Sequence, residues 1–177
     1  MDFFGLDIGS HTIKAIKLVK NGQSYQLLAF GSSPSNSRGL ISEADSDMTA
    51  LAESIKKLCQ TSGIKTKNVV SALPQDQVFT RVITLPSLSE TELNSALKWE
   101  AEQYVPIPLE EVTLAHQIVG KVKEDNKEKM EVLLVAAPNR LIEKTVEILR
   151  VAGLRAVGLE TETLAIARSL VLSLIHI

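Results

Sequence analysis

The stretch that decides the fold lies at the start of the chain and reads FFGLDIGSHTIKAIK over residues 3–17. An apolar strand runs into a short Asp-x-Gly-Ser turn and is followed by a second strand. Glycine can adopt backbone conformations closed to residues with a Cβ, so the amides of Gly9, Ser10 and His11 can converge on an anion. An ordinary β-hairpin shows the same pattern, so other parts of the chain must decide between the two readings.

Two charged side chains flank this turn. Asp7 stands at the end of the first strand, where its carboxylate can hold Mg²⁺ through water, because hard oxygen ligands suit a phosphate-bound magnesium. Lys14, on the returning strand, can reach back and neutralise phosphate charge. If the turn holds a phosphate, its site consists of Asp7, Gly9, Ser10, His11 and Lys14, with Asp7 as the magnesium residue.

Composition narrows the class of protein. The chain has 177 residues, of which 45% are hydrophobic and 23% charged, so it can bury the core of one medium domain or two small ones. Its 19 basic and 21 acidic residues give a net charge of −2 without a basic run, so nucleic acid is not expected as a partner. The amino terminus lacks the pattern of a signal peptide, which makes the cytoplasm the expected location.

The single cysteine and the three histidines offer little chemistry. Cys59 excludes an internal disulfide and fits a reducing compartment. It lies on the apolar stripe of an expected helix, so we interpret it as a small buried residue and not as a nucleophile. His11, His116 and His176 have no metal-ligand spacing, and we expect no metal site built on them.

The carboxy-terminal tract, residues 164–177, is apolar but too short to span a bilayer, and it is predicted as a buried helix. It has no stop signal, and residues 172–177 resemble the translation of a sequencing adapter, so we expect the native sequence to stop near Val171. Leu164, Leu170, Val171, Leu174 and Ile175 form an apolar surface that we expect to drive any self-association.

Hydrophobic periodicity predicts alternating strands and helices. Strands are expected at residues 3–8, 12–19, 25–31, 69–73, 78–85, 112–119, 130–136 and 156–159. Helices are expected from Asp47 to Gly63, from Ser89 to Pro106, from Asn139 to Gly153 and from about Thr161. A polar loop is expected over residues 32–42 and a charged hairpin loop over residues 121–129.

The helix that begins at Ser89 has the clearest local signature. Residues 89–92, Ser-Glu-Thr-Glu, form a capping box, and Leu88 and Leu93 stand where a hydrophobic staple requires them. The expected buried stripe consists of Leu93, Leu97, Ala101 and Tyr104. Trp99 falls nearly opposite, and we expect it to pack against a second element, with an exposed anchor for a partner as the alternative.

Two helices are predicted to end in the same way. Gly63 is followed by Ile64 and Gly153 by Leu154, and a strand follows each. Glycine supplies a left-handed cap at such a corner, and the next apolar residue packs back on the helix. Before the second corner, Ile142, Val146, Leu149 and Ala152 are expected to face a core. These repeated corners indicate an α/β protein.

Several segments of the chain together resemble a known family. The opening stretch resembles the first phosphate hairpin of the superfamily of actin, heat-shock chaperone ATPases and sugar kinases. Four later segments, in this order, resemble the type IV pilus assembly protein PilM family, a relative of the cell-division protein FtsA: VVSALP (69–74), TRVITLP (80–86), WEAEQYVPIPLEEV (99–112) and LLVAA (133–137). The resemblance runs from about Phe4 to Val171.

The resemblance implies a partial actin-like ATPase fold. Residues 1–73 with 157–177 resemble subdomain 1A with the phosphate hairpin, and residues 74–156 resemble the inserted FtsA-type subdomain 1C. In family members a second half supplies another phosphate hairpin and the adenosine pocket, and this sequence contains no second Asp-x-Gly hairpin. ATP and Mg²⁺ are therefore expected as cofactors of a full-length protein, and we expect this chain by itself to hold neither.

The resemblance also implies a function. It is that of a cytoplasmic ATP-binding scaffold for pilus assembly, which binds the amino-terminal cytoplasmic peptide of a PilN-type inner-membrane protein where 1A and 1C meet. Such a protein works at the inner face of the inner membrane and touches the membrane only through partners. Two alternatives stay open: a kinase of the sugar- and acid-kinase superfamily, and an interaction module with a vestigial nucleotide site. No catalytic residue is identifiable, so no catalysis is expected from this chain alone.

Overall fold

The chain folds into two compact units. A computed structural model describes residues 2–22, 24–35, 38–124 and 127–174. The first unit comprises Met1–Gln75 and Ile142–Ile177, and the second comprises Asp76–Leu141. No helix in the described part of the chain is long and apolar enough to cross a bilayer.

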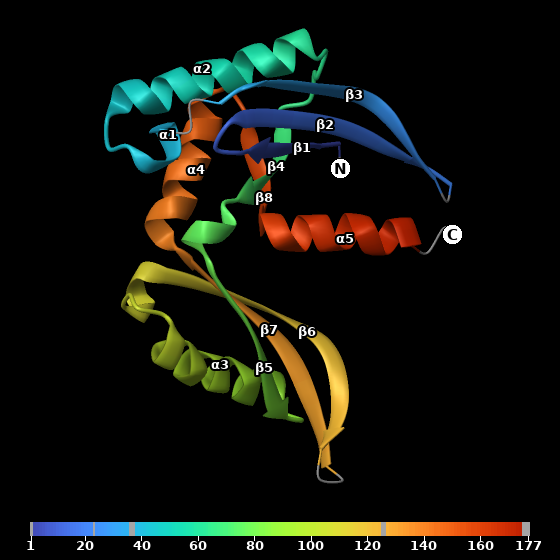
Figure 1. Ribbon diagram of the computed structural model, residues 1–177, viewed down its shortest axis with the longest axis vertical. Coiled ribbons are helices and arrows are strands. Elements are labelled where there is room, and N and C mark those ends of the chain that lie inside the picture. Colours follow the sequence, from blue (N-terminus) through green and yellow to red (C-terminus); the bar gives the residue numbers. More distant parts are fainter. Residues whose placement is uncertain (1, 23, 36–37, 125–126, 175–177) are drawn as a thin grey trace. The chain divides into compact units, whose positions relative to one another are not determined.

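The first unit contains a five-stranded sheet with the strand order β3-β2-β1-β4-β8 (Figure 1). Its strands are β1 (Phe4–Ile8), β2 (Thr12–Asn21), β3 (Ser24–Pro34), β4 (Asn68–Leu73) and β8 (Arg155–Thr161). β2 pairs antiparallel with both β1 and β3, whereas β4 pairs parallel with both β1 and β8. The carboxyl ends of the three parallel strands therefore lie at one edge of the sheet.

Helices cover both faces of this sheet. They are α1 (Arg38–Ile41), α2 (Asp45–Thr61), α4 (Asn139–Val151) and α5 (Glu162–Leu174). The apolar sides of α2 and α4 pack with alternate residues of β1, β2 and β4 in one core, which includes Phe4, Leu6, Ile13, Leu51, Ile55, Val69, Ile148 and Leu149. Helix α5 lies on the other side of the sheet from α2 (Figure 1).

The two predicted helix-to-strand corners are confirmed. Gly63 and Gly153 have φ angles of 70° and 78°, in the left-handed region that favours glycine. The amide of Ile64 donates to the Cys59 carbonyl at 3.0 Å, and the amide of Leu154 donates to the Leu149 carbonyl at 2.8 Å. These bonds satisfy carbonyls that the helix ends leave free and send the chain into β4 and β8, which pair with each other.

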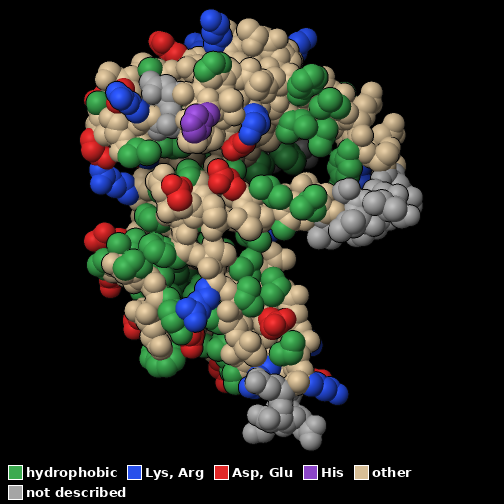
Figure 2. All heavy atoms as spheres, in the orientation of Figure 1, with side chains coloured by type: hydrophobic (Ala, Val, Ile, Leu, Met, Phe, Trp, Pro, Cys, Tyr) green, Lys and Arg blue, Asp and Glu red, His purple; other side chains and the backbone are tan. Residues whose placement is uncertain are grey.

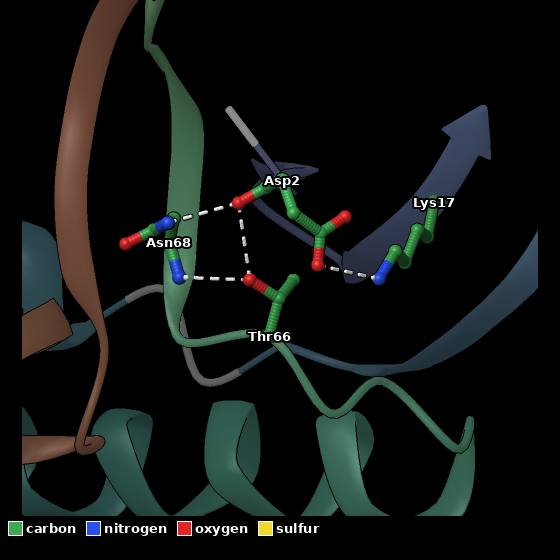
Figure 3. Close-up of polar contacts among 4 residues, drawn as sticks. All are labelled: Asp2, Lys17, Thr66 and Asn68. Carbon is green, nitrogen blue, oxygen red and sulfur yellow. Dashed lines mark hydrogen bonds and ion pairs between the residues drawn. The ribbon is translucent and has the colours of Figure 1, made fainter. Parts of the chain in front are cut away.

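A polar cluster holds the start of the chain against β4 and β2 (Figure 3). The Asp2 carbonyl accepts hydrogen bonds from Thr66 Oγ1 at 3.1 Å and from Asn68 Nδ2 at 2.9 Å. The Asp2 carboxylate pairs with Lys17 Nζ at 3.0 Å. Asn68 Oδ1 also accepts from the Arg155 guanidinium at 2.7 and 3.0 Å. These bonds tie β1, β2, β4 and β8 together at the amino end of β1.

The second unit is a three-stranded antiparallel sheet of order β5-β7-β6, covered on one face by a helix. Its elements are β5 (Phe79–Pro86), α3 (Glu90–Tyr104), β6 (Val112–Glu124) and β7 (Lys127–Pro138), with short 3-10 turns η1 (Gln75–Gln77) and η2 (Leu109–Glu111). The capping box is confirmed, because Ser89 and Glu92 exchange side-chain to backbone hydrogen bonds. Leu93, Leu97 and Ala101 pack on Val132, Leu134 and Ala136.

Two predicted loops are wrong in extent. Over residues 32–42, β3 continues to Pro34 and α1 follows, because Leu40 is buried in the core. The charged loop at residues 121–129 is mostly strand, since β6 continues to Glu124 and β7 begins at Lys127. Exposed positions of a strand accept charged side chains, so the composition of residues 121–129 did not reveal the two strands.

Three side chains differ from their predicted burial. Trp99 is 63% exposed and lies on the side of α3 away from the sheet, so the prediction that it packs against a second element is wrong. Tyr104 is also exposed, with the Arg81 guanidinium carbon 3.6 Å from its ring centroid. Val146 of α4 is 40% exposed, whereas Ile148 and Leu149 are buried, because the buried side of α4 is rotated from the predicted stripe.

The boundary between the units also differs from the sequence interpretation. The resemblance groups residues 142–156 with residues 74–141 in the inserted segment, but the structure places them in the first unit. The reason is that Ile148, Leu149 and Ala152 of α4 belong to the core under the five-stranded sheet.

Candidate functional site

The five predicted site residues lie together in the hairpin between β1 and β2. Asp7 is directly opposite Lys14 in the strand register, and Ile8 is opposite Ile13. Gly9, Ser10 and His11 form the turn between the two strands. Ile8 and Ile13 are buried and fix the hairpin to the core, whereas Ser10 and His11 are exposed. The sheet thus presents a rigidly anchored turn to solvent at the carboxyl end of β1.

The turn amides are not equivalent. The Gly9 amide donates to the Thr12 carbonyl at 3.0 Å and closes the turn. Among the residues that the structure describes, none accepts a hydrogen bond from the amide of Ser10 or His11. Gly9 is not among the glycines with a positive φ angle, and its need for glycine is steric, because a Cβ there would lie 3.0 Å from the Thr12 carbonyl oxygen. Ser10 and His11 are therefore the donors that remain for an anion.

Asp7 and Lys14 form an ion pair across the hairpin. Lys14 Nζ lies 3.2 Å from Asp7 Oδ2, and their side chains are 62% and 37% exposed respectively. An ion pair this exposed contributes about 0–1 kcal/mol, so a phosphate or a hydrated cation can displace it at little cost. The arrangement supplies one carboxylate and one ammonium beside the free turn amides.

Two further contacts shape the turn. The His11 carbonyl accepts from the Ser35 amide at 2.8 Å, which ties the turn to the end of β3. Ser10 Oγ lies 2.9 Å from His11 Nδ1, so the His11 side chain is held beside the turn by its neighbour. Sequence reasoning left the role of this side chain open and did not find Ser35, which is distant in sequence and carries no motif.

The parallel register brings further polar residues to the same edge of the sheet. Strand β8 ends at Thr161, which is paired with Leu73 at the end of β4. Glu160 holds Arg168 at 2.7 Å, and Glu162 accepts from the Gln75 amide at 3.2 Å. Ligands of open α/β sheets bind outside the carboxyl ends of the strands, so these carboxylates lie at the edge where a ligand of the hairpin is expected. No sequence motif marked them.

The remaining reactive side chains stay outside this site. Cys59 is buried in α2, and desolvation raises the pKa of its thiol, which keeps it protonated and inert. His116 lies on β6 in the other unit, and His176 is outside the described residues. Within residues 2–22, 24–35, 38–124 and 127–174, no group of three metal-ligating side chains occurs.

The chain is similar to a known protein family and to solved structures. A family model for type IV pilus assembly protein PilM matches residues 5–176. A solved PilM-PilN type IV pilus biogenesis complex is similar to this chain, with a TM-score of 0.80 and 30% identity over 92% of this chain and 48% of that chain. The cytoplasmic domain of EpsL, an inner membrane component of the type II secretion system of Vibrio cholerae, matches with a TM-score of 0.59 and 14% identity, over 93% of this chain and 59% of that one.

These likenesses define the fold of the chain. It is an α/β fold that corresponds to part of an actin-like ATPase fold. The chain spans about half the length of the chain that it matches in the PilM-PilN complex.

Proposed function

The chain belongs to the type IV pilus assembly protein PilM family, and from this premise we propose that it acts in a cytoplasmic, actin-like, ATP-binding scaffold for pilus assembly. In this proposal the scaffold binds the amino-terminal cytoplasmic peptide of a PilN-type protein at the inner face of the inner membrane. Membrane contact is made only through such partners.

The observation that carries the proposal is the similarity to the PilM-PilN complex. At 30% identity and a TM-score of 0.80 over 92% of this chain, the likeness covers both compact units and not the hairpin alone. That complex contains PilN, which supports a PilN-type partner for the present chain. An extended peptide can bind such a surface with main-chain hydrogen bonds and apolar pockets.

The peptide proposal is tested with a fluorescent synthetic peptide that carries the cytoplasmic amino terminus of a PilN-type protein. Fluorescence anisotropy should show saturable binding to this chain, or to a longer family member that contains it. A scrambled peptide of the same composition is the control. Equal binding of the native and scrambled peptides by both proteins would refute the proposal.

The ATP proposal rests on the hairpin. The amides of Ser10 and His11 can donate to a phosphate, Lys14 can offset its charge, and Asp7 can hold Mg²⁺ through water. Bound Mg-ATP would supply a γ-phosphate, whose contacts can hold a protein in one of two states. The chain's own residues provide one phosphate turn, so tight binding requires the longer protein.

Two matched aspartates, one at each end of β1, test this role in a longer family member. Asp7→Ala removes the carboxylate at the hairpin, whereas Asp2→Ala removes a carboxylate that also pairs with a lysine, at the opposite end of β1. Calorimetry should show weaker Mg-ATP binding for Asp7→Ala and unchanged binding for Asp2→Ala, with native circular dichroism for both. Equal affinities of the two variants for Mg-ATP would show that Asp7 takes no part in binding it.

One observation favours the alternative of an interaction module with a vestigial nucleotide site. The Asp7 carboxylate is already paired with Lys14, and the Gly9 amide already has an acceptor, so the hairpin closes on itself without a ligand. Peptide binding without any Mg-ATP binding by the longer protein would establish this alternative. No observation in the described residues favours the kinase alternative, and we do not propose it.

A further inference from the structure

Strands β2 and β3 extend beyond the rest of their sheet. Among the described residues, β1 pairs with β2 from Ile13 to Ile16, and the outer residues of β2 have β3 as their one strand neighbour. We call this part the ribbon: Leu18–Asn21 of β2 paired with Ser24–Leu27 of β3. The ribbon projects past the amino end of β1 (Figure 1). A two-stranded hairpin is at best marginally stable in water, so such a ribbon gains from another strand.

Apolar side chains on the ribbon are exposed. The register pairs Leu18 with Leu27 and Val19 with Gln26, which places apolar groups on both faces. Leu18, Val19, Tyr25 and Leu27 are 42–50% exposed. The space-filling view shows hydrophobic side chains gathered where Figure 1 draws β2 and β3 (Figure 2). An apolar surface of this kind indicates an interaction site.

The free edge of the ribbon carries no charge. β3 is the edge strand of the sheet, and its eleven residues, SYQLLAFGSSP, include no Asp, Glu, Lys or Arg. Natural edge strands usually carry charged side chains that prevent pairing with other strands. The bulge at Leu28 protects only the middle of β3, because the four residues before it form a regular ladder.

The register shows which backbone groups point away from β2. Asn21 and Ser24 flank a two-residue turn, so they form a hydrogen-bonded pair. Hydrogen-bonded and open pairs alternate along an antiparallel ladder, so Val19 and Gln26 also form a hydrogen-bonded pair. The N–H and C=O groups of Tyr25 and Leu27 therefore point outward, where a further strand would lie.

We propose that this edge pairs with the same edge of a second copy of the chain, antiparallel and with the two-fold axis at Gln26. Tyr25 of each copy then lies opposite Leu27 of the other, which forms about four main-chain hydrogen bonds. The two-fold symmetry makes the contact self-complementary, as in most homodimers. The two ribbons become a four-stranded sheet with their apolar side chains in contact.

Sterics confine the contact to the ribbon. In the inner part of β3, Leu58 and Ser62 of α2 pack directly over Gly31. Two neighbouring strands lie only about 4.8 Å apart, so two copies of α2 would overlap if the inner parts paired. In the ribbon, by contrast, residues 18–21 and 24–27 are all exposed.

Charge does not oppose the contact. The only charged residue of the ribbon is Lys20, on β2. In the paired arrangement the two β2 strands are separated by three strand spacings, about 14 Å. This exceeds the screening length of about 8 Å at physiological salt, so repulsion between the two lysines is weak. An uncharged partner strand from the same chain thus fits this edge.

A cysteine cross-link tests the geometry. On the two-fold axis, Gln26 faces its own copy in an open pair with Cα atoms about 4.5 Å apart, within disulfide range. Gln26→Cys should form a covalent dimer under mild oxidation. Ser32, in the inner part of β3 and away from the axis, is also exposed, and Ser32→Cys is the matched control. The native Cys59 is buried and does not compete. Cross-linking no faster for Gln26→Cys than for Ser32→Cys would refute the proposal.

Sedimentation velocity of the full chain tests whether the edge of the ribbon causes dimerisation. Tyr25→Pro removes an outward N–H and leaves the bonds to β2 intact, so it should shift the chain to monomer, as should Leu27→Lys. The alternative source of self-association is the carboxy-terminal tract, where Leu164 is half-buried, Leu170 is 57% exposed and the side chains of Val171, Leu174 and Ile175 are outside the described part. Leu170→Lys should leave the dimer unchanged. A monomeric parent chain at millimolar concentration, or loss of the dimer in Leu170→Lys alone, would overturn the assignment.

Discussion

Replacement of Gly31 by alanine tests the packing of α2 on β3, on which the position of the free ribbon depends. A Cβ at Gly31 would lie well inside contact distance of Ser62 Oγ, 3.0 Å from Leu58 Cδ1 and 3.2 Å from Ser62 Cβ. The φ angle of Gly31 is not positive, so its need for glycine is purely steric. Either Ser62 rotates or the end of α2 shifts away from the sheet.

The magnitude follows from two opposing effects. Overpacking a well-packed contact costs about 1–3 kcal/mol. Alanine in place of glycine in a strand recovers about 0.5–1 kcal/mol, because it restricts the unfolded chain. The two ranges combine to about 0–2.5 kcal/mol, and we therefore expect Gly31→Ala to lower the free energy of unfolding of the first unit by about 1 kcal/mol. In a Ser62→Ala background the closest atom is gone, so the same change should cost less than it does in the presence of Ser62.

The assay is urea denaturation of the four proteins of this double-mutant cycle, followed by far-ultraviolet circular dichroism. Trp99 is the only tryptophan and lies in the second unit, so its fluorescence reports that unit as an internal control. Its transition should not change. If Gly31→Ala lowers stability equally with Ser62 and with Ala at position 62, the coupling energy is zero and the steric argument is refuted.

Three further outcomes are expected. First, hydrogen bonds from the Ser89 side chain and backbone lower the pKa of Glu92 from 4.5, so this carboxylate stabilises α3 above its ordinary pKa and loses that contribution as the pH falls through the lowered value. Ser89→Ala should cost about 1 kcal/mol at pH 7 and flatten the acid dependence of Trp99-detected unfolding, and an unchanged acid dependence would exclude the cap as its source. Second, Asn68→Ala should lower the stability of the first unit by about 1–2 kcal/mol, because it removes the bonds to Asp2 and Arg155, whereas Asp2→Ala keeps its backbone carbonyl and should cost less in thermal denaturation. Third, calorimetry of this chain alone with Mg-ATP should show no saturable binding at micromolar concentration, and tight one-to-one binding would show that a single phosphate turn suffices.

The parts of the fold that depend on neighbouring residues could be predicted from the sequence. The capping box at Ser89 and the left-handed corners at Gly63 and Gly153 form from residues a few positions apart, so their motifs are complete in the sequence. The hairpin of Asp7 and Lys14 is local for the same reason, and the five predicted residues are brought together there. Their binding of nucleotide stays a prediction.

Features that depend on distant segments could not be predicted in this way. The periodicity of α4 did not show that Val146 is exposed, or that the helix shares a core with β1, because the choice of buried side depends on a sheet whose strands begin at Phe4, Asn68 and Arg155. The carboxylates of Glu160 and Glu162 reach the edge of the hairpin only because β1, β4 and β8 run parallel.

The amino-acid sequence alone determined the α/β class, the hairpin that joins Asp7 to Lys14, the helix caps and, through its resemblance, the family. Only the tertiary structure decided that the Gly9 amide closes its own turn, that Trp99 is exposed, and that the outer part of β3 has a free, uncharged edge. Local motifs specify backbone geometry over a few residues, whereas exposure and strand edges exist only after segments far apart in sequence have paired.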